Sequence, residues 1–250
     1  MVNRIGEQAL NNQGCMMTII GYRNAKDIDV QFNDELNTIL TNRVYDSFKK
    51  GTIKNPNYAS VYSVGRLGEG NYSKKTDLKA YEAWRSMIQR CYDTKYQLKQ
   101  PTYIGCTVCE EWHCFQNFAE WYYDNYYEVP EQTMALDKDT LYKGNRTYSP
   151  DTCVFVPQCI NNLFTKCDKH RGNLPVGVSF HKQHNKYHSK CGDGLGHTIH
   201  LGYYDTPEQA FESYKQYKEQ LIKDVADEYK DLIPEVLYNA MLNYEVEIND

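Results

Sequence analysis

The first part of the chain alternates apolar and polar residues in the manner of half-buried strands. In DIDVQF, residues 27–32, every second side chain is apolar, and a period of two places those side chains on one face of a strand. Strands are also expected in MTII at 17–20 and ASVYSV at 59–64. One helical turn is expected in YDSFKK at 45–50. These elements predict a β-rich module over residues 1–66, which ends at the glycine-rich stretch GRLGEGNYSKK.

A helical period replaces the alternation in the middle of the chain. After a cap at Thr76 or Asp77, apolar residues recur at near-helical spacing; they are Leu78, Tyr81, Trp84, Ile88 and Cys91. A second helix is expected over residues 112–122, and we interpret its aromatic stripe as core packing; the stripe is Trp112, Phe115, Phe118 and Trp121. Two short apolar strands and a helix follow in residues 136–164, so the block 76–166 is expected to form one domain.

Three short strands and one helix account for the next block. PVGVSFHK, KYHSKCG and HTIHLGYYD carry strand patterns and are separated by polar turns. Thr206 is suited to cap the following helix, with Pro207 at its first position and Glu208 in its first turn. Residues 172–228 therefore predict a three-stranded sheet packed on a helix, and residues 229–250 a C-terminal helical tail. The fold class expected for the whole chain is α+β.

Composition limits the environments in which the chain is expected to work. Its 250 residues are 41% hydrophobic with a mean hydropathy of −0.74, and no apolar run approaches the about 20 residues of a membrane span. The start MVNRIGEQALNNQG lacks a secretory pattern, so we expect a cytoplasmic protein without a membrane partner. Nine cysteines then indicate reduced thiols, and because Cys106 and Cys109 form the only CxxC, no zinc site is expected.

Charge is distributed unevenly although the net charge is only −5. Residues 165–202 carry six cations against two acids, whereas residues 203–250 carry four cations against twelve acids. A basic segment beside an acidic one favours a local surface for phosphate groups. The 23 tyrosines add flat rings and hydroxyls that suit nucleic acid.

Three segments between residues 80 and 161 form a family pattern, AYEAWRSMIQRCY, YIGCTVCEEWHCFQNFAEW and LDKDTLYKGNRTYSPDTCVFVPQCIN. Together they resemble the HNH-type endonuclease-like proteins of bacteriophages. The resemblance implies an HNH-like ββα-metal module, in which one divalent cation contacts the scissile phosphate and a neighbouring base activates water. It maps the metal-binding positions onto Asp137 and Asn161, and Mg²⁺ or Mn²⁺ is the expected ion because carboxylate and amide oxygens suit hard cations.

Lys138 occupies the position of the family's base histidine. A free lysine has a pKa of about 10.4 and is protonated at neutral pH, so Lys138 is expected to be a poor base and a plausible phosphate clamp. Thr152 stands where relatives often carry asparagine, which weakens the loop that orients the base. The catalytic candidates are therefore Lys138 and Asp139, with a metal-bound hydroxide or one of the seven histidines as alternative bases.

A second family pattern lies in GVSF at 177–180, KYHSK at 186–190, HLGYYDTPEQA at 200–210 and Tyr214. It resembles the AP2-type DNA-binding domain, which implies double-stranded DNA as partner and a sheet placed in the major groove. The side chains expected to face DNA are Ser179, His181, Lys182, Lys186, His188, Lys190 and His200. Plant members carry arginines and tryptophans at several of these positions, so weaker sequence discrimination is expected here. A metal site of His181, His188 and His200 is a secondary hypothesis.

Two functions fit these resemblances. The first is a phage- or mobile-element-encoded HNH-like DNA endonuclease of the homing type, a metal-dependent phosphodiester hydrolase with an AP2-like DNA-binding domain. The alternative is a catalytically inactive DNA-binding protein or an inhibitor of host defence, which would meet a host protein through the acidic residues 203–250. A third interpretation of the site stays open, in which Asp137 and Asn161 are turn and cap residues that bind no metal.

Overall fold

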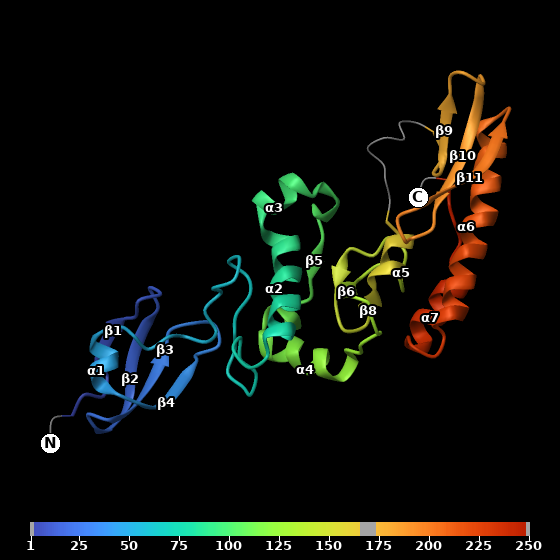
Figure 1. Cartoon of the computed structure of the whole chain (residues 1–250). Coiled ribbons are helices and arrows are strands. Elements are labelled where there is room, and N and C mark those ends of the chain that lie inside the picture. Colours follow the sequence, from blue (N-terminus) through green and yellow to red (C-terminus); the bar gives the residue numbers. More distant parts are fainter. Residues whose placement is uncertain (1–2, 166–173, 249–250) are drawn as a thin grey trace. The chain divides into compact units, whose positions relative to one another are not determined.

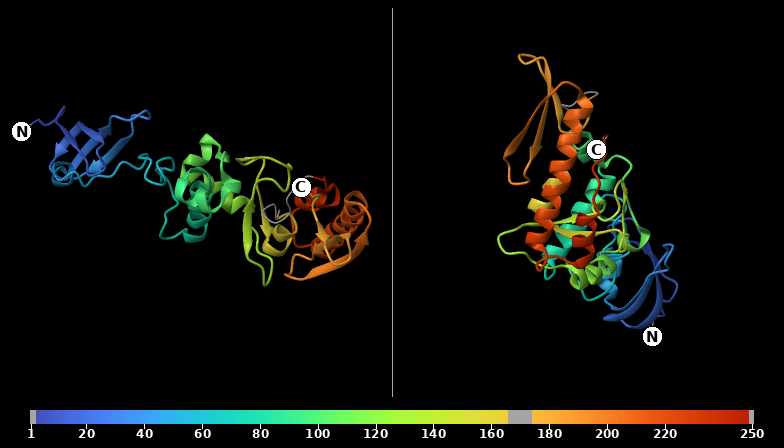
Figure 2. Two further views of the ribbon diagram at one scale, coloured as in Figure 1. Left: turned by 90° about the horizontal axis from the view of Figure 1, so that it is seen from above. Right: turned by 90° about the vertical axis from the view of Figure 1, so that its right-hand side faces the viewer.

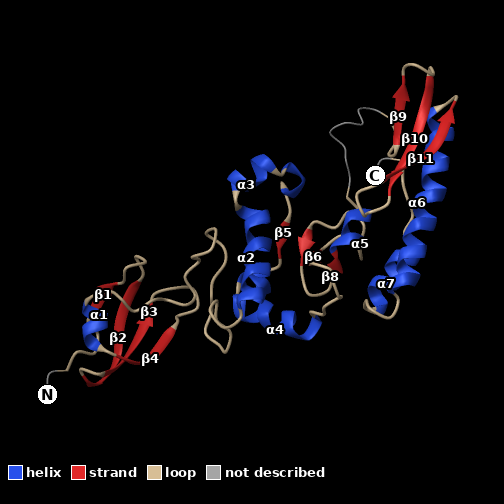
Figure 3. Ribbon diagram, viewed as in Figure 1, coloured by secondary structure: helices blue, strands red, loops and turns tan. Residues whose placement is uncertain are grey.

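The computed structural model describes residues 3–165 and 174–248 and has the α+β architecture that the sequence predicts (Figures 1 and 3). The chain divides into two compact units, residues 1–124 and residues 125–250. Across the described ranges, no helix combines the length and the apolar character needed to cross a membrane.

The first unit begins with a four-stranded antiparallel sheet in the order β1-β2-β3-β4. Its elements are β1 (Gln8–Leu10), β2 (Met16–Asn24), β3 (Asp27–Phe32), β4 (Ile39–Arg43) and the following helix α1 (Tyr45–Lys49). Val30 lies opposite Ile19 on one side and Leu40 on the other, so the apolar half of each strand joins one buried face. Tyr45 and Phe48 of α1 complete this core.

The predicted strand over residues 59–64 is wrong. Tyr62 and Ser63 have positive φ angles of 50° and 60°, and Val61 pairs with Gly65, so the segment is a tight turn. Strands β1 and β4, which the pattern did not predict, have three and five residues and too few apolar positions to show an alternation.

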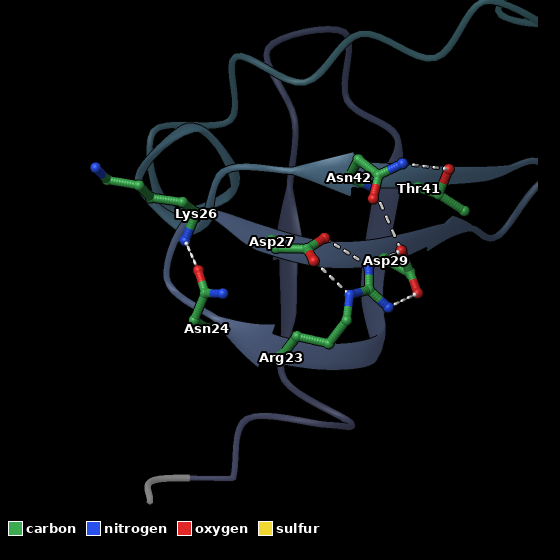
Figure 4. A network of polar contacts seen from close by, with 7 residues as sticks. All are labelled: Arg23, Asn24, Lys26, Asp27, Asp29, Thr41 and Asn42. Carbon is green, nitrogen blue, oxygen red and sulfur yellow. Dashed lines mark hydrogen bonds and ion pairs between the residues drawn. The ribbon is translucent and has the colours of Figure 1, made fainter.

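A charge network fixes the β2–β3 hairpin (Figure 4). Arg23 donates Nε and Nη2 to the two oxygens of Asp27, both at 2.6 Å, and Nη1 and Nη2 to those of Asp29, at 2.7 and 2.6 Å. Asp29 also accepts the backbone N–H of Asn42 at 3.3 Å. The guanidinium lowers the pKa of both aspartates. Gly21 lies opposite Asp29, and a Cβ there would approach the carboxylate Oδ2 to 2.5 Å, so glycine leaves room for this ion pair.

The rest of the first unit is built from short helices around an aromatic core. Its elements are α2 (Leu78–Tyr92), α3 (Thr94–Lys99), a 3₁₀ turn (Pro101–Tyr103), β5 (Thr107–Val108), a second 3₁₀ turn (Glu110–His113) and α4 (Phe115–Asn125). Trp84 donates its indole N–H to the carbonyl of Trp112 at 2.7 Å. Trp112, Phe115 and Phe118 are buried and Trp121 is half-buried, so the aromatic stripe is core as expected. The helix begins at Phe115 rather than at Trp112, which lies in the preceding 3₁₀ turn.

The second unit starts with a strand–loop–strand–helix segment. Its elements are β6 (Met134–Asp137), β7 (Thr147–Tyr148), β8 (Val154–Pro157) and α5 (Gln158–Leu163). Strands β6 and β8 are antiparallel, and α5 contacts both of them. Val156 and Ile160 of this segment share a core with Ile222 and Leu237 from the two C-terminal helices, α6 (Pro207–Tyr229) and α7 (Glu235–Leu242).

A three-stranded antiparallel sheet packs on α6 in the same unit (Figures 1 and 2). The strands are β9 (Val178–His181), β10 (Lys186–Gly192) and β11 (Thr198–Tyr204), as predicted. Thr206 caps α6 by accepting the backbone N–H of Gln209 at 3.2 Å, and Pro207 is the first helical residue, also as predicted. The limits of the modules inferred from the sequence stay predictions, because the second unit combines the β6–α5 segment with this sheet.

Candidate functional site

Asp137 ends strand β6, opposite Val154 of β8, and its side chain shapes the turn that follows. Its Oδ1 accepts the backbone N–H of Asp139 at 2.9 Å and that of Thr140 at 2.7 Å. An aspartate that bonds the backbone two and three residues ahead closes a tight turn. One oxygen of the predicted metal ligand is therefore already engaged by the main chain.

Lys138 points into the protein rather than to solvent. Its side chain is only 10% exposed, and its Nζ lies 3.2 Å from Oδ2 of Asp139 and 5.7 Å from the ring centroid of the buried Tyr148. The charge is thus balanced by a carboxylate and a ring face.

Asp139 is the most perturbed carboxyl of this loop. Desolvation by its surroundings raises its pKa, and the Asp137 carboxylate raises it further, while Lys138 works in the opposite direction. The side chain keeps 47% exposure, so solvent moderates the effect and still reaches the group. A carboxylate with a raised pKa is a better proton acceptor near neutral pH, which is the role expected for Asp139 as an alternative base.

Asn145 stabilises the loop through hydrogen bonds, a role that the sequence pattern did not indicate. Its Nδ2 donates to the carbonyl oxygens of Lys138 at 2.7 Å and Thr147 at 2.8 Å, and its Oδ1 accepts the backbone N–H of Thr147 at 3.1 Å. Thr152 adds a hydrogen bond to the same Thr147 carbonyl at 2.9 Å. The loop is therefore held by an amide that lies seven residues after Lys138.

Asn161 lies in the middle of α5 and is half-buried. Its backbone oxygen accepts the N–H of Phe164 and the hydroxyl of Thr165, whereas its carboxamide has no hydrogen bond to another residue that the structure describes. The helix packs on both β6 and β8. Asn161 thus has an amide oxygen without a hydrogen bond to the described residues, on the helix that packs on strands β6 and β8.

The donor types of Asp137 and Asn161 fit a hard divalent cation such as Mg²⁺ or Mn²⁺. Over residues 3–165 and 174–248, no group of three or more His, Cys, Asp or Glu is arranged to hold a metal ion. A cation held by Asp137 and Asn161 would therefore need water molecules for the rest of its coordination. The secondary hypothesis of a three-histidine site on the sheet has no such group to support it.

The predicted DNA-facing residues lie together on the outer face of the sheet, opposite α6. Val178 and Ser189 are paired and buried on the helix side, so their neighbours on each strand point outward. The outer face, as we name it, consists of Ser179, His181, Lys186, His188, Lys190, His200 and Tyr203. Lys182 is exposed in the turn after β9. Lys186 forms an ion pair with Asp205 at 2.9 Å, which leaves Lys182 and Lys190 as the exposed cations without a described acidic partner.

Tyr203 lies on the outer face, and His184 lies next to it in the β9–β10 turn, although the sequence did not place either of them there. The ring centroids of His181, His184, His188 and His200 lie 5.1, 4.7, 4.9 and 4.9 Å from that of Tyr203. Strict alternation from His200 would have turned Tyr203 inward. A β-bulge shifts the register, so that Ser189 pairs with Gly202 but Lys190 with His200, and Leu201 is the additional residue.

The histidines are close enough to influence one another. Nε2 of His188 is in direct hydrogen-bond contact with Nδ1 of His200. Burial lowers the pKa of His188, and His200, Lys190 and His181 lower it further. The neutral form of His188 is therefore favoured beside the fixed charge of Lys190.

Of the basic residues in the segment 165–202, Lys166, Lys169 and Arg171 lie outside the described residues. The structure therefore describes only those basic residues of the segment that lie on the strands and in the turn after β9, namely Lys182, Lys186 and Lys190. No family model, no curated protein and no solved structure matches this chain.

Proposed function

We propose that the chain binds double-stranded DNA through the outer face of the β9–β11 sheet. The observation that carries this proposal is the convergence of three strands' lysine, histidine, serine and tyrosine side chains on one solvent-facing surface. Lysines neutralise phosphates, and hydroxyl and imidazole groups donate to phosphate or base edges. Helix α6 packs on the other face of the sheet, so we assign the DNA contacts to the outer face.

The composition of the outer face supports backbone binding more than base readout. Lysine binds phosphate as a point charge, whereas bidentate recognition of guanine is the strength of arginine. The described part of the outer face contains no arginine. We infer a salt-sensitive interaction with modest sequence preference.

A second candidate function is metal-dependent hydrolysis of the bound DNA at the Asp137 loop, as the HNH resemblance implies. Asp137 and Asn161 would hold Mg²⁺ or Mn²⁺, and the ion would stabilise charge on the leaving oxygen. Asp139, solvent-accessible and with a raised pKa, would accept the proton of the attacking water. Asp139 is a better candidate base than Lys138 because its side chain is 47% exposed, whereas that of Lys138 is 10% exposed.

Binding is tested with a fluorescent duplex and the full-length chain in EDTA, by anisotropy at several salt concentrations. Removal of one phosphate contact lowers the slope of log K against log salt by about 1. We expect that reduction in Lys190→Gln and not in Lys223→Gln, an exposed lysine of α6 on the far side of the sheet. Equal slopes in the two variants would contradict the assignment of the outer face.

Cleavage is tested separately with supercoiled plasmid and Mg²⁺ or Mn²⁺. Nicking that disappears in Asp137→Ala and in Asp139→Asn, while anisotropy still reports DNA binding, supports the second function. Absence of nicking by the wild type under conditions of saturated binding leaves a DNA-binding protein without nuclease activity. Nicking that persists in Asp137→Ala places the activity elsewhere.

A further inference from the structure

The outer face carries an imidazole pair that the proposed contacts with lysine do not explain. His188 of β10 and His200 of β11 meet through Nε2 and Nδ1 in an exposed position. Their ring centroids are 4.5 Å apart, and Tyr203 lies 4.9 Å from each. Two titratable rings on neighbouring strands are therefore held in a defined relative orientation.

This contact determines how many N–H groups the pair can offer to a ligand. Two neutral imidazoles have two N–H groups in total, and one must lie between the facing nitrogens because two lone pairs repel. One N–H is then left to point away from the pair. One added proton gives each ring an outward N–H, at Nδ1 of His188 and Nε2 of His200, together with one positive charge.

The surroundings oppose this protonation when no anion is present. The titratable and charged groups on the outer side of the sheet around the pair are His181 of β9, Lys182 and His184 of the next turn, Lys186 and Lys190 of β10, Asp193 and His197 of the following turn, and Tyr203 and Asp205 at the end of β11. On the covered side they are Tyr187 and Cys191 of β10, Tyr204 of β11 and Lys218 of α6. Both acids already have partners: Asp205 binds Lys186 at 2.9 Å and Asp193 binds His197 at 2.8 Å. Lys190, directly opposite His200, is a fixed positive neighbour.

We propose that the His188–His200 pair is a proton-dependent binding site for a phosphodiester oxygen, and that DNA binding on the outer face takes up a proton. The inference rests on the proposed DNA-binding function and adds the ligand group and its protonation. A phosphate oxygen compensates the lysine and histidine charges that disfavour the imidazolium. It accepts one of the outward N–H groups, and charge-assisted hydrogen bonds of this kind are the stronger ones.

The consequence is a linkage between pH and affinity. Because the bound phosphate raises the pKa of the pair, affinity rises as pH falls from about 8 to about 6, around the ordinary histidine pKa of about 6.5. Uptake of one proton corresponds to a change of up to about tenfold in the dissociation constant per pH unit. A lysine-only surface would show no such change in this range.

The test is isothermal titration calorimetry of the full chain with a short mixed-sequence duplex in EDTA, at pH 7 in two buffers of different ionisation enthalpy. The difference in measured heat gives the number of protons taken up, and we expect a value between about 0.5 and 1. In the double variant His188→Gln, His200→Gln the uptake should fall to near zero. Its affinity at pH 6 should drop to about the wild-type value at pH 8.

The matched control is His197→Gln, an exposed histidine in the β10–β11 turn whose partner is Asp193. This variant should keep the wild-type proton uptake. Wild-type binding without proton uptake overturns the inference and leaves the DNA-binding function intact, whereas no binding at any pH overturns both. If the double variant unfolds, the single variant His200→Gln and the proton uptake of the wild type still test the inference. A wild-type uptake of zero contradicts the proposed protonation of the His188–His200 pair.

Discussion

Replacement of Gly177 by alanine tests how α6 is seated on the β9–β11 sheet. Gly177 precedes β9 with a φ of +73°, and a Cβ there would lie 2.1 Å from Cδ2 and 2.3 Å from Cγ of Tyr214 in α6. Carbon atoms pack at about 3.5–4.0 Å, so the ring or the helix must retreat by more than about 1 Å. Glycine is therefore required here both by the backbone and by the neighbouring ring.

The magnitude follows from these two terms. A non-glycine residue in the left-handed region costs about 1–2 kcal/mol, and an overpacked contact costs about 1–3 kcal/mol. The free energy of unfolding of the second unit should fall by about 2–5 kcal/mol, which is a large part of the about 5–15 kcal/mol typical of a domain.

Hydrogen exchange of the full chain, followed by mass spectrometry, measures this loss locally in peptides of β9, β10 and α6. The control is Gly144→Ala, with a similar φ of +81° but no atom within 4 Å of the added Cβ; it should lose only about 1–2 kcal/mol in its own loop. In the double variant with Tyr214→Ser, the total loss should be smaller than the sum of the single losses. If Gly177→Ala costs no more than Gly144→Ala, the packing argument is refuted.

Three further predictions concern stability. Asn145→Ala removes two donors from the Lys138 loop and should cost about 1–3 kcal/mol, seen as faster exchange in the loop's peptides. Arg23→Met should destabilise the N-terminal sheet at pH 7, because the guanidinium lowers the pKa of Asp27 and Asp29. The difference in thermal stability between variant and wild type should disappear as the pH falls below about 4 and both carboxylates become protonated. Thermal unfolding measured at several pH values tests this. Ile160→Ala empties a fully buried site and should cost about 2–5 kcal/mol, measured by exchange in both α5 and α6.

The elements that the sequence predicted correctly are those whose pattern has a local cause. Thr206, Pro207 and the strands of the β9–β11 sheet follow from capping and from a period of two, and the structure confirms them. The turn at Tyr62 was missed because its two positive φ angles occur at residues other than glycine, which sequence patterns do not reveal.

In the candidate sites, too, residues placed by a local pattern could be predicted, whereas residues placed by tertiary contacts could not. The outer face could be predicted except at Tyr203, because a bulge changes the side on which a residue lies without any local sequence signal. Asn145 could not be recognised, since its importance comes from reaching the carbonyl of Lys138 across the loop. Burial of Lys138 against Asp139 and Tyr148 is likewise a tertiary property, which the sequence does not reveal.

Helix α6 explains why the two candidate sites belong to one unit. Near its N-terminus, Tyr214 packs against Gly177 beside the sheet, whereas Ile222 and Ala226 nearer its C-terminus enter the core formed by β8, α5 and α7. The buried residues of α6 form one row with spacings of four or eight residues, namely Ala210, Lys218, Ile222 and Ala226. Such a row does not reveal that its two halves meet different partners, so the sequence suggested two separate domains. Because both surfaces depend on the same helix, loss of its core packing should weaken the DNA-binding face and the Asp137 loop together, whereas Lys190→Gln or Asp137→Ala should affect only one of them.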